Sequence, residues 1–264
     1  MIKFFRHIRK SLIEKNKMGK YFKYAIGEII LVVIGILIAL GINNWNENRK
    51  QKLEEKIILA QLHTEFNSNL KQLNQKIELK KEIINSALKL FKYIDFEELR
   101  NKDSIDYYLA RTIPYTTFDP IVNEITLSNQ LNLLQNDSLK QKLTYWTSEL
   151  ADNREDELTW KYYRENKYIP FLVEHYQLRT IRNLANQSNL LEKYLIEENT
   201  SNIVAKIGKS KYEENYNTLL NLPNFEDHIE RCVTQNRHSL NQSLILRKKI
   251  MQIIGILDHE IKHR

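Results

Sequence analysis

The hydrophobic pattern of the chain is dominated by an apolar run near its N-terminus. Residues 25–42 form a stretch of 18 with a single charged side chain, Glu28. The apolar part of a secretory signal spans only about 7 to 15 residues. A helix from Tyr24 to Trp45 rises roughly 31 Å, close to the hydrocarbon thickness of a bilayer. The pattern predicts one transmembrane helix, and the triplet Ala39-Leu40-Gly41 leaves signal-peptidase cleavage as an alternative.

A second apolar pattern begins directly after the predicted span. From Leu59 to Phe91 apolar residues recur at steps of three, four or seven, which is typical of an amphipathic helix. Only the pair Lys80-Lys81 interrupts this stripe. No glycine or proline lies between Gly41 and Pro114, so nothing breaks the helix as it leaves the membrane. We predict one helix from Asn44 to about Ile94, whose apolar stripe must be covered by partner helices.

Helical signals continue through the rest of the chain. Capping residues and prolines predict helices that start at Asp103 or Ser104, at Asp119-Pro120 and at Asn136, and that run to Ala110, Leu134 and about Lys167. Residues 171–222 are expected to form short helices and loops. Asn224 is expected to start a last helix of about 38 residues. Its predicted apolar stripe is Ile229, Val233, Leu240, Leu244, Met251, Ile254, Leu257 and Ile261.

These elements define the expected fold class. No alternation typical of strands and no internal repeat occurs in the chain. The prediction is an all-α protein, in which a single transmembrane helix continues into a long helix that packs with further helices as an extended helical bundle. The predicted divisions are a basic segment over residues 1–24, the transmembrane helix over 25–42 and one all-α domain over 43–264.

Positive charge is concentrated before the apolar run. Residues 1–24 contain eight Lys and Arg residues and one acidic residue, Glu14. The net charge of this segment therefore equals the net charge of the whole chain, +7. The remainder carries equal numbers of basic and acidic side chains. The positive-inside rule therefore predicts a cytoplasmic N-terminus and a domain on the other side of the membrane. In a bacterium with two membranes this means a single-pass inner-membrane protein with a periplasmic C-terminal domain.

The basic segment has the pattern of a helix lying on a membrane surface. Apolar residues fall on one half of a helical projection and basic residues mostly on the other, so anionic lipid is the expected partner. A disordered basic tail is the alternative, and nucleic-acid contact is not expected. The residues assigned to the membrane surface are Lys3, Arg6, Arg9, Lys10, Lys17, Lys20 and Lys23. The aromatic residues assigned to the interfaces are Tyr21, Tyr24 and Trp45, because amphipathic rings favour that depth.

One face of the predicted transmembrane helix combines small and polar residues. Successive helical residues are separated by 100°, so Glu28, Gly35, Ala39 and Asn46 fall within about 20° of a common direction. Small residues let two backbones approach, and a polar group in lipid gains from a partner, which favours a homodimer through this helix. The alternative is that the carboxylate of Glu28 reaches the head groups and no dimer forms.

Two segments carry a family resemblance. The start "MIKFFR" with "YAIGEIILVVIGILIALGINNWNENRK", and the later stretch "LSNQLNLLQNDSLKQKLTYW", resemble an uncharacterised family of single-pass, membrane-anchored helical proteins of Bacteroidota that carry a domain of unknown function. The resemblance implies a helical envelope protein with one membrane pass. It implies no activity, cofactor or catalytic residue.

One stretch near the end matches a metal-binding motif. The segment from His259 to His263 has the form H-E-x-x-H, in which two imidazoles on a helix bind zinc and Glu260 is the general base. Both histidines fall opposite the predicted apolar stripe. We therefore expect a solvent-exposed polar end and assign no metal site and no cofactor. Metal-dependent hydrolysis is kept as a remote alternative.

Three further features are expected to be structural. Aromatic residues are dense between Tyr145 and Tyr176, where packing is expected and a ligand pocket is the alternative. The charged segment 151–157 between them is predicted to be a solvated face. Cys232 is the only cysteine, so no internal disulfide is available, and a buried position is expected, with an intermolecular bridge as the alternative.

The functional expectation follows from topology rather than from reactive groups. The chain shows no nucleophilic triad, phosphate loop or dinucleotide motif. We expect a non-enzymatic envelope protein whose helical domain binds as yet unidentified envelope proteins or scaffolds an assembly. The alternative is a ligand-sensing domain that signals through a separate membrane partner.

Overall fold

The chain is described by a computed structural model that covers residues 18–122, 129–187, 208–212 and 215–263. Within these residues every regular element is a helix and no strand occurs, which confirms the predicted all-α class. The chain divides into two units, Met1–Ile57 and Ile58–Arg264.

The longest element is α2, Met18–Asp95, a continuous helix of 78 residues. It confirms the prediction that the apolar run and the amphipathic stripe belong to one helix. Arg100 holds the end of α2, because its Nε donates to the carbonyl of Tyr93 at 2.8 Å and its Nη2 to the carbonyl of Ile94 at 3.4 Å. A cation on the last free carbonyls stabilises a helix C-terminus.

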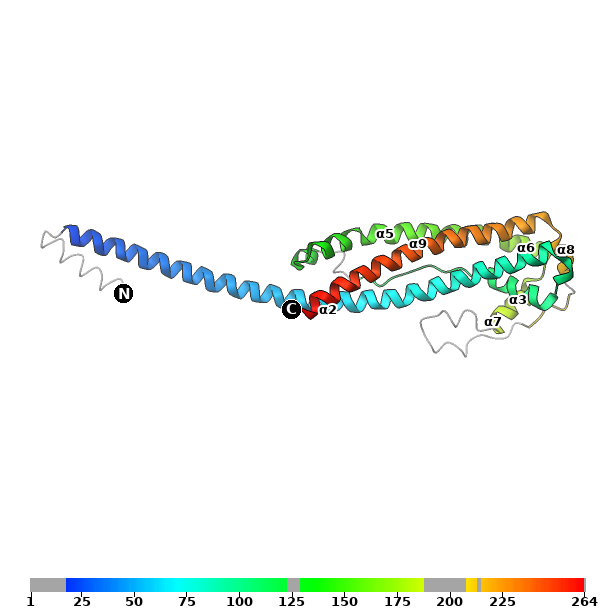
Figure 1. The fold of residues 1–264 in the computed structure, drawn as a ribbon, viewed down its shortest axis with the longest axis horizontal. Helices are drawn as coiled ribbons and strands as arrows, with labels where there is room; N and C mark the ends of the chain where they lie inside the picture. The colour runs from blue at the N-terminus through cyan, green and yellow to red at the C-terminus, as the bar shows by residue number, and fades with distance from the viewer. Residues whose placement is uncertain (1–17, 123–128, 188–207, 213–214, 264) are drawn as a thin grey trace. The chain divides into compact units, whose positions relative to one another are not determined.

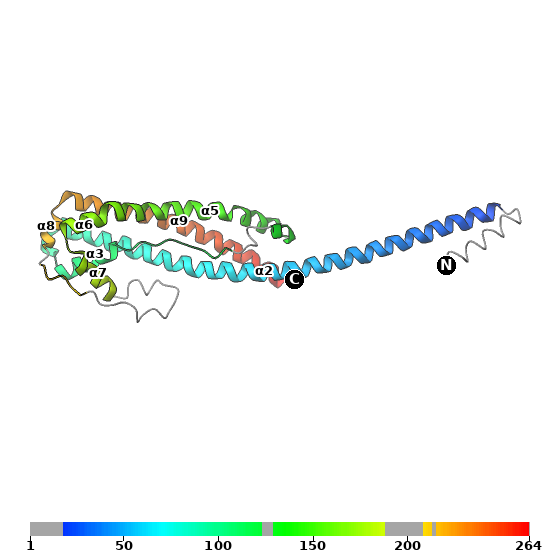
Figure 2. The same cartoon turned by 180° about the vertical axis from the view of Figure 1, so that it is seen from behind.

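Three long helical segments lie side by side in the unit Ile58–Arg264 (Figure 1 and Figure 2). They are the part of α2 in this unit, α5 (Asp137–Tyr163) and α9 (Pro223–Lys262). The aromatic rings of Phe66 and Trp146 lie 5.1 Å apart between centroids in their shared core. Other buried members from these three segments include Leu59, Leu62, Leu73, Leu139, Leu143, Ile250, Ile253 and Leu257.

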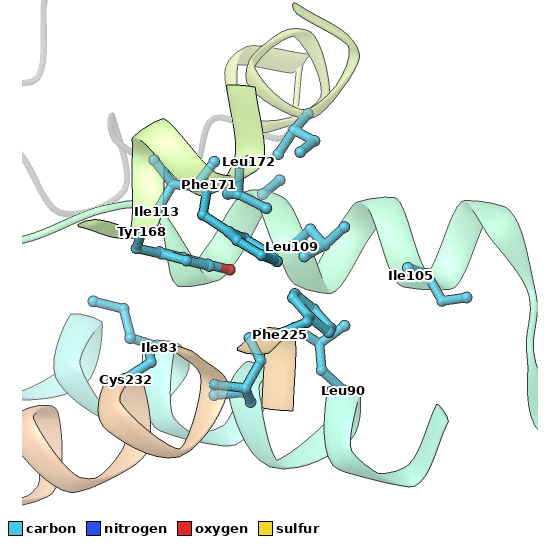
Figure 3. Close-up of a cluster of buried hydrophobic side chains, with 14 of the residues drawn as sticks. Ile83, Leu90, Ile105, Leu109, Ile113, Tyr168, Phe171, Leu172, Phe225 and Cys232 are labelled. Atoms are coloured by element: carbon cyan, nitrogen blue, oxygen red, sulfur yellow. The ribbon is translucent and has the colours of Figure 1, made fainter. Parts of the chain in front are cut away.

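A second core closes the opposite end of these three segments (Figure 3). The helices α3 (Lys102–Thr112), α6 (Ile169–His175) and α8 (Tyr216–Leu220) pack there against α2 and α9. Buried residues from all five helices meet in it, among them Ile83, Leu90, Ile105, Leu109, Leu172, Leu219, Phe225 and Cys232. The short elements η1 (Glu97–Leu99) and α7 (Leu178–Gln187) complete this end.

Side-chain caps start three of the described helices, α3, α5 and α8. Asn136 accepts from the backbone N–H of Leu139 at 2.9 Å and so caps α5, as predicted. The cap of α3 is Asn101, whose side chain accepts from the N–H of Ser104 at 2.9 Å. The predicted cap, Asp103 or Ser104, is therefore wrong by two or three residues. An asparagine side chain fulfils the same role at this earlier position.

The helical path of α5 continues beyond its expected end. The π-helical turn η3 (Arg164–Tyr168) follows α5 and leads directly into α6. Pro170 lies in the first turn of α6, directly after η3, and because it has no N–H it cannot donate to a carbonyl of the preceding turn. We predicted that the helix would end before this proline. Instead, the chain changes there from an α-helix to a π-helical turn and back to an α-helix. The short helices α6, α7 and α8 agree with the prediction for residues 171–222 in its described part, and residues 188–207 and 213–214 lie outside the described residues.

An extended segment, residues 113–122, replaces the start of the helix predicted from Asp119-Pro120. Its backbone is bonded by side chains of α2. The amide of Gln72 donates to the carbonyl of Asp119 at 3.0 Å and accepts from its N–H at 3.2 Å. Asn69 makes the same pair of bonds to Ile121 at 2.8 and 2.9 Å. These bonds satisfy the backbone without a helix, which the capping pattern could not indicate.

Only a short helix occurs in the remaining described part of that prediction. It is the 3-10 helix η2 (Asn129–Leu133), while residues 123–128 lie outside the described residues. The prediction of one helix up to Leu134 is therefore wrong.

The buried face of α9 differs from the predicted stripe. Leu244, Met251 and Ile261 are exposed, although Ile229, Val233 and Leu257 are buried as expected. The inward positions in the middle of α9 are held by Ser239, Ser243, Leu246, Ile250 and Ile253. The hydroxyl of Ser243 faces a buried charge, which a pattern of apolar residues does not indicate. α9 itself begins at Pro223, one residue before the predicted start.

Candidate functional site

The apolar run predicted to cross a membrane lies in the N-terminal part of α2. It contains an 18-residue window with a mean hydropathy of 2.8, and none of that window is buried. Uncovered aliphatic side chains of this density are costly in water. Among the described residues this is the one helix long and apolar enough to span a bilayer.

The predicted association face is carried by this single helix. Glu28 and Asn46 are half-buried, and Ala39 is exposed. A Cβ atom added at Gly35 would meet no atom within 4 Å in the single chain. The face therefore has room for a second helix, and its use in a dimer stays a prediction.

The interfacial residues are described only in part. Trp45 is 65% exposed, and the guanidinium carbon of Arg49 lies 5.6 Å from its ring centre. Lys23 is exposed on the first turns of α2. The side chains of Lys20, Tyr21 and Tyr24 lie outside the described residues, as do Lys3, Arg6, Arg9, Lys10 and Lys17.

A buried charge cluster occupies the interior between α2, α5 and α9. The Nζ of Lys80 donates to Oε1 of Glu157 at 2.6 Å and to Oγ of Ser243 at 2.7 Å. The second oxygen of Glu157 accepts from the backbone N–H of Phe118 at 2.7 Å. Lys80 is 2% exposed, and the Glu157 side chain is fully buried. Lys80 and Glu157 together therefore join three helical segments and the extended segment 113–122.

Burial controls the electrostatics of this cluster. It lowers the pKa of Lys80 below the ordinary value of a lysine, and the Glu157 carboxylate opposes that shift. The pKa of Lys76 is lowered by burial as well, with Glu157 and Asp119 opposing. Breaking a buried pair costs more than the pair contributes, because the remaining charge is left uncompensated.

This cluster corrects two sequence interpretations. Lys80 does not interrupt the apolar stripe of α2 but occupies it, paired, whereas Lys81 is exposed and bonded to Glu78 at 2.8 Å. The segment 151–157 is not wholly a solvated face, because Asn153 and Glu157 are buried. A lysine on the buried face of a helix requires an acidic partner. The position of Lys80 in the apolar stripe could therefore have predicted a buried carboxylate such as that of Glu157.

A hydroxyl beside a lysine is a pair used in nucleophilic catalysis. In this chain Ser243 is fully buried and Lys80 is held by a carboxylate, so a substrate has no access to either group. The Ser243 hydroxyl also donates to Oδ1 of Asn153 at 3.3 Å, so both groups are hydrogen-bonded within the protein. The geometry assigns the cluster to holding the helices in register.

The H-E-x-x-H segment lies at the end of α9. His259 and His263 are exposed, with ring centres 4.4 Å apart, which confirms the solvated face predicted for them. Glu260 accepts from the amide of Asn136 at 2.7 Å and so contacts the residue that caps α5. Within the described residues no group of three His, Cys, Asp or Glu side chains converges as metal ligands would.

The aromatic-rich region is mainly packing. The ring of Trp160 is 2% exposed, lies 6.1 Å from the ring of Tyr163 between centroids, and donates from Nε1 to the carbonyl of Pro114 at 3.3 Å. Tyr145 and Tyr162 are exposed at 59% each. The buried position expected for Cys232 is confirmed, and burial raises the pKa of its thiol.

Comparison with known proteins finds a match to one family model and indicates no activity. A family model described as a family of unknown function (DUF6090) matches residues 28–144. No curated protein and no solved structure matches the chain. Over its matched part, which runs from α2 through α3 into the start of α5, the chain is therefore similar to a family whose function is not assigned.

Proposed function

We propose that this chain is a membrane-anchored, non-enzymatic envelope protein whose helical domain binds partner proteins or scaffolds an assembly. The observation that carries the proposal is the uncovered apolar window of α2, in a helix that continues without a break into the first helix of a bundle. Lipid is the environment that would cover such a window. Inside the bundle the buried charges of Lys80 and Glu157 bond α2 to α5 and to the extended segment 113–122.

The proposed topology rests on charge. The net charge of +7 resides in residues 1–24, and this end of a span is the one retained in the cytoplasm. The chain is then a single-pass inner-membrane protein with the domain over residues 43–264 in the periplasm. The proposed partners are lipid, other envelope proteins and a second copy through Glu28, Gly35, Ala39 and Asn46.

Fractionation and tag accessibility test the anchor. A C-terminally tagged chain should stay with membranes at alkaline pH, and its tag should be digested from the periplasmic side only. Replacing Ile34 by Lys should release the chain, because a lysine at mid-membrane costs about 3 kcal/mol. The matched control is Leu53→Lys, on an exposed position of α2 outside the window. A soluble wild-type chain, or a tag digested only from the cytoplasmic side, would refute the proposal.

The partners are tested by crosslinking in native membranes. Reproducible crosslinks from the bundle to particular envelope proteins would support the interaction role. Catalytic turnover by the purified full chain, abolished by a side-chain substitution that leaves folding intact, would contradict its non-enzymatic part.

A further inference from the structure

A cavity of about 440 Å³ lies between α2 and α3, beside the second core, against which its lining residue Tyr108 packs. Polar residues of α2, including Glu82, Asn85 and Lys89, line one side, and Tyr107, Tyr108 and Arg111 of α3 line the other. Its volume is within the range of small-ligand sites, roughly 300 to 1,000 Å³. None of these residues takes part in the buried charge cluster or in the proposed membrane anchor.

Arg111 is fixed in this wall by three contacts. Its Nε donates to Oε1 of Glu82 at 2.9 Å, and its Nη1 donates to the carbonyl of Tyr107 at 3.1 Å. The guanidinium carbon lies 3.4 Å from the centre of the Tyr107 ring, so the two planes are in contact. Arg111 is only 6% exposed. Its orientation is therefore set before any ligand arrives, which reduces the entropy cost of binding.

One end of this guanidinium is not used by the protein. Within the described residues Nη2 of Arg111 has no hydrogen-bond partner, although the side chain is more than nine-tenths buried and lines the cavity. A guanidinium presents five N–H donors, and a planar carboxylate matches two of them at once. An unused, pre-oriented donor edge on a cavity wall therefore indicates an anionic ligand.

The surrounding charges indicate how large the negative charge of the ligand is. The cavity is lined by three cations, Lys81, Lys89 and Arg111, and by two carboxylates, Glu78 and Glu82. Lys81 is paired with Glu78 and Arg111 with Glu82. Lys89 is exposed and has no ion-pair partner in the described part of the chain. The excess of one positive charge fits a monoanion, and two nearby carboxylates disfavour a dianion.

We propose that this cavity binds a small organic monocarboxylate, with the carboxylate on Nη2 of Arg111 and Lys89 and the apolar part beside Tyr107 and Tyr108. The two tyrosine rings meet edge to face, with centroids 5.2 Å apart, and Tyr107 is 44% exposed. Such rings offer an apolar surface to the ligand body. The site would give the bundle a ligand-sensing role in addition to the proposed interaction role.

Equilibrium dialysis of the full chain in nanodiscs, with labelled benzoate at constant ionic strength, tests the site. We expect saturable binding of one benzoate per chain, displaced by excess acetate. Inorganic phosphate at the same ionic strength should displace it much less. Absent or non-saturable binding would overturn the proposal, and displacement by phosphate as effective as that by acetate would overturn the carboxylate preference. Membrane attachment of the same samples reports on the anchor separately.

Variants locate the binding. Arg111→Lys should weaken benzoate binding by more than about tenfold, because it removes the planar donor edge. Lys89→Ala, at an exposed position that cannot affect folding strongly, should weaken it by about fivefold. The matched control is Lys71→Ala, an exposed lysine of α2 that does not line the cavity. Equal losses in Lys71→Ala and Lys89→Ala would show a general charge effect and refute the site, even if Arg111→Lys fails to fold.

Discussion

The Nζ atom of Lys80 lies 2.6 Å from a carboxylate oxygen of Glu157, and both side chains are buried where three helical segments meet. The pair is specific because each partner has a second bond, from Lys80 to Ser243 and from the N–H of Phe118 to Glu157. A misplaced helix would leave one charge without its partner. The pair therefore selects one register of the bundle over its neighbours.

Removing one partner should destabilise the bundle strongly. Lys80→Met leaves the carboxylate of Glu157 buried without its cation, and we expect a loss of about 3–5 kcal/mol in the free energy of unfolding. The double variant Lys80→Met with Glu157→Gln should recover much of that loss, because the glutamine carbonyl still accepts from Phe118. Urea denaturation followed by circular dichroism measures both.

Lys81→Met is the matched control for that pair of variants. Its side chain is exposed and bonded only to Glu78, so the free energy should change by less than about 1 kcal/mol. A loss in Lys80→Met no larger than in this control would show that the buried pair does not hold the bundle.

The extended segment 113–122 should depend on two side-chain amides. Asn69→Leu removes both hydrogen bonds to the backbone of Ile121, and we expect a loss of about 1–3 kcal/mol for the unpaired groups. Hydrogen exchange resolved by residue should show faster exchange at Ile121 and Asp119. Lys71→Ala, exposed on the same helix, should leave both rates unchanged. Unchanged exchange in Asn69→Leu would mean that the segment is held by packing alone.

Acid should weaken the second core through His228. Burial lowers the pKa of His228 below 6.5, with Asp227 opposing, and the Tyr163 hydroxyl lies 2.9 Å from its Nδ1. The unfolded chain therefore binds this proton more readily than the folded chain, so its contribution is complete above pH 6.5 and decreases as pH falls below it. His228→Gln should show a smaller drop in Tm between pH 7.5 and pH 5.5. Exposed His263→Gln should keep the wild-type drop; equal drops in both variants would exclude His228 as the source.

The thiol of Cys232 should be unreactive in the folded chain. It is fully buried, and burial raises its pKa, so little thiolate forms near neutral pH. Maleimide labelling measured by mass spectrometry should be slow in buffer and fast in urea. Leu244→Cys on the exposed side of the same helix should label at once. Rapid native labelling of Cys232, or a disulfide-linked dimer of the wild-type chain, would contradict this burial.

The predicted membrane dimer should depend on small residues of one helix face. Replacing Gly35 and Ala39 by Leu should weaken self-association in a membrane two-hybrid assay, because bulky side chains separate the backbones. Gly41→Leu is the matched control, since Gly41 lies about 140° from Glu28 around the helix. Unchanged association in the double variant would favour the alternative, in which the carboxylate of Glu28 reaches the head groups.

Helix existence was more predictable than helix environment. Local sequence patterns correctly predicted three features, because tertiary contacts did not change them. These are the unbroken helix through Asn44 and Ile94, the cap at Asn136 and the burial of Cys232. The helix predicted from Asp119 failed, because amide side chains of a distant helix bind that backbone in an extended form. No local pattern contains this information.

The faces of helices were predicted less well for a related reason. Leu244 and Met251 were expected inside and are exposed, while Ser243 is inside. The position of Ser243 is set by Lys80, which lies 163 residues earlier in the chain. The Arg111 cavity was missed as well, since its cation and carboxylate stand on different helices and each resembles an ordinary surface charge in isolation.

The contact between Lys80 and Ser243 also bears on the order of events during biosynthesis. Helix α9 supplies Ser243, Ile250 and Leu257 to the interior, so the partly translated chain holds α2 and α5 without their third neighbour. The bundle can close only after α9 has emerged from the ribosome. Until then the apolar faces of α2 and α5 around Phe66 and Trp146 lack the cover that α9 gives them, and exposed apolar surface of this kind favours aggregation of the unfinished chain.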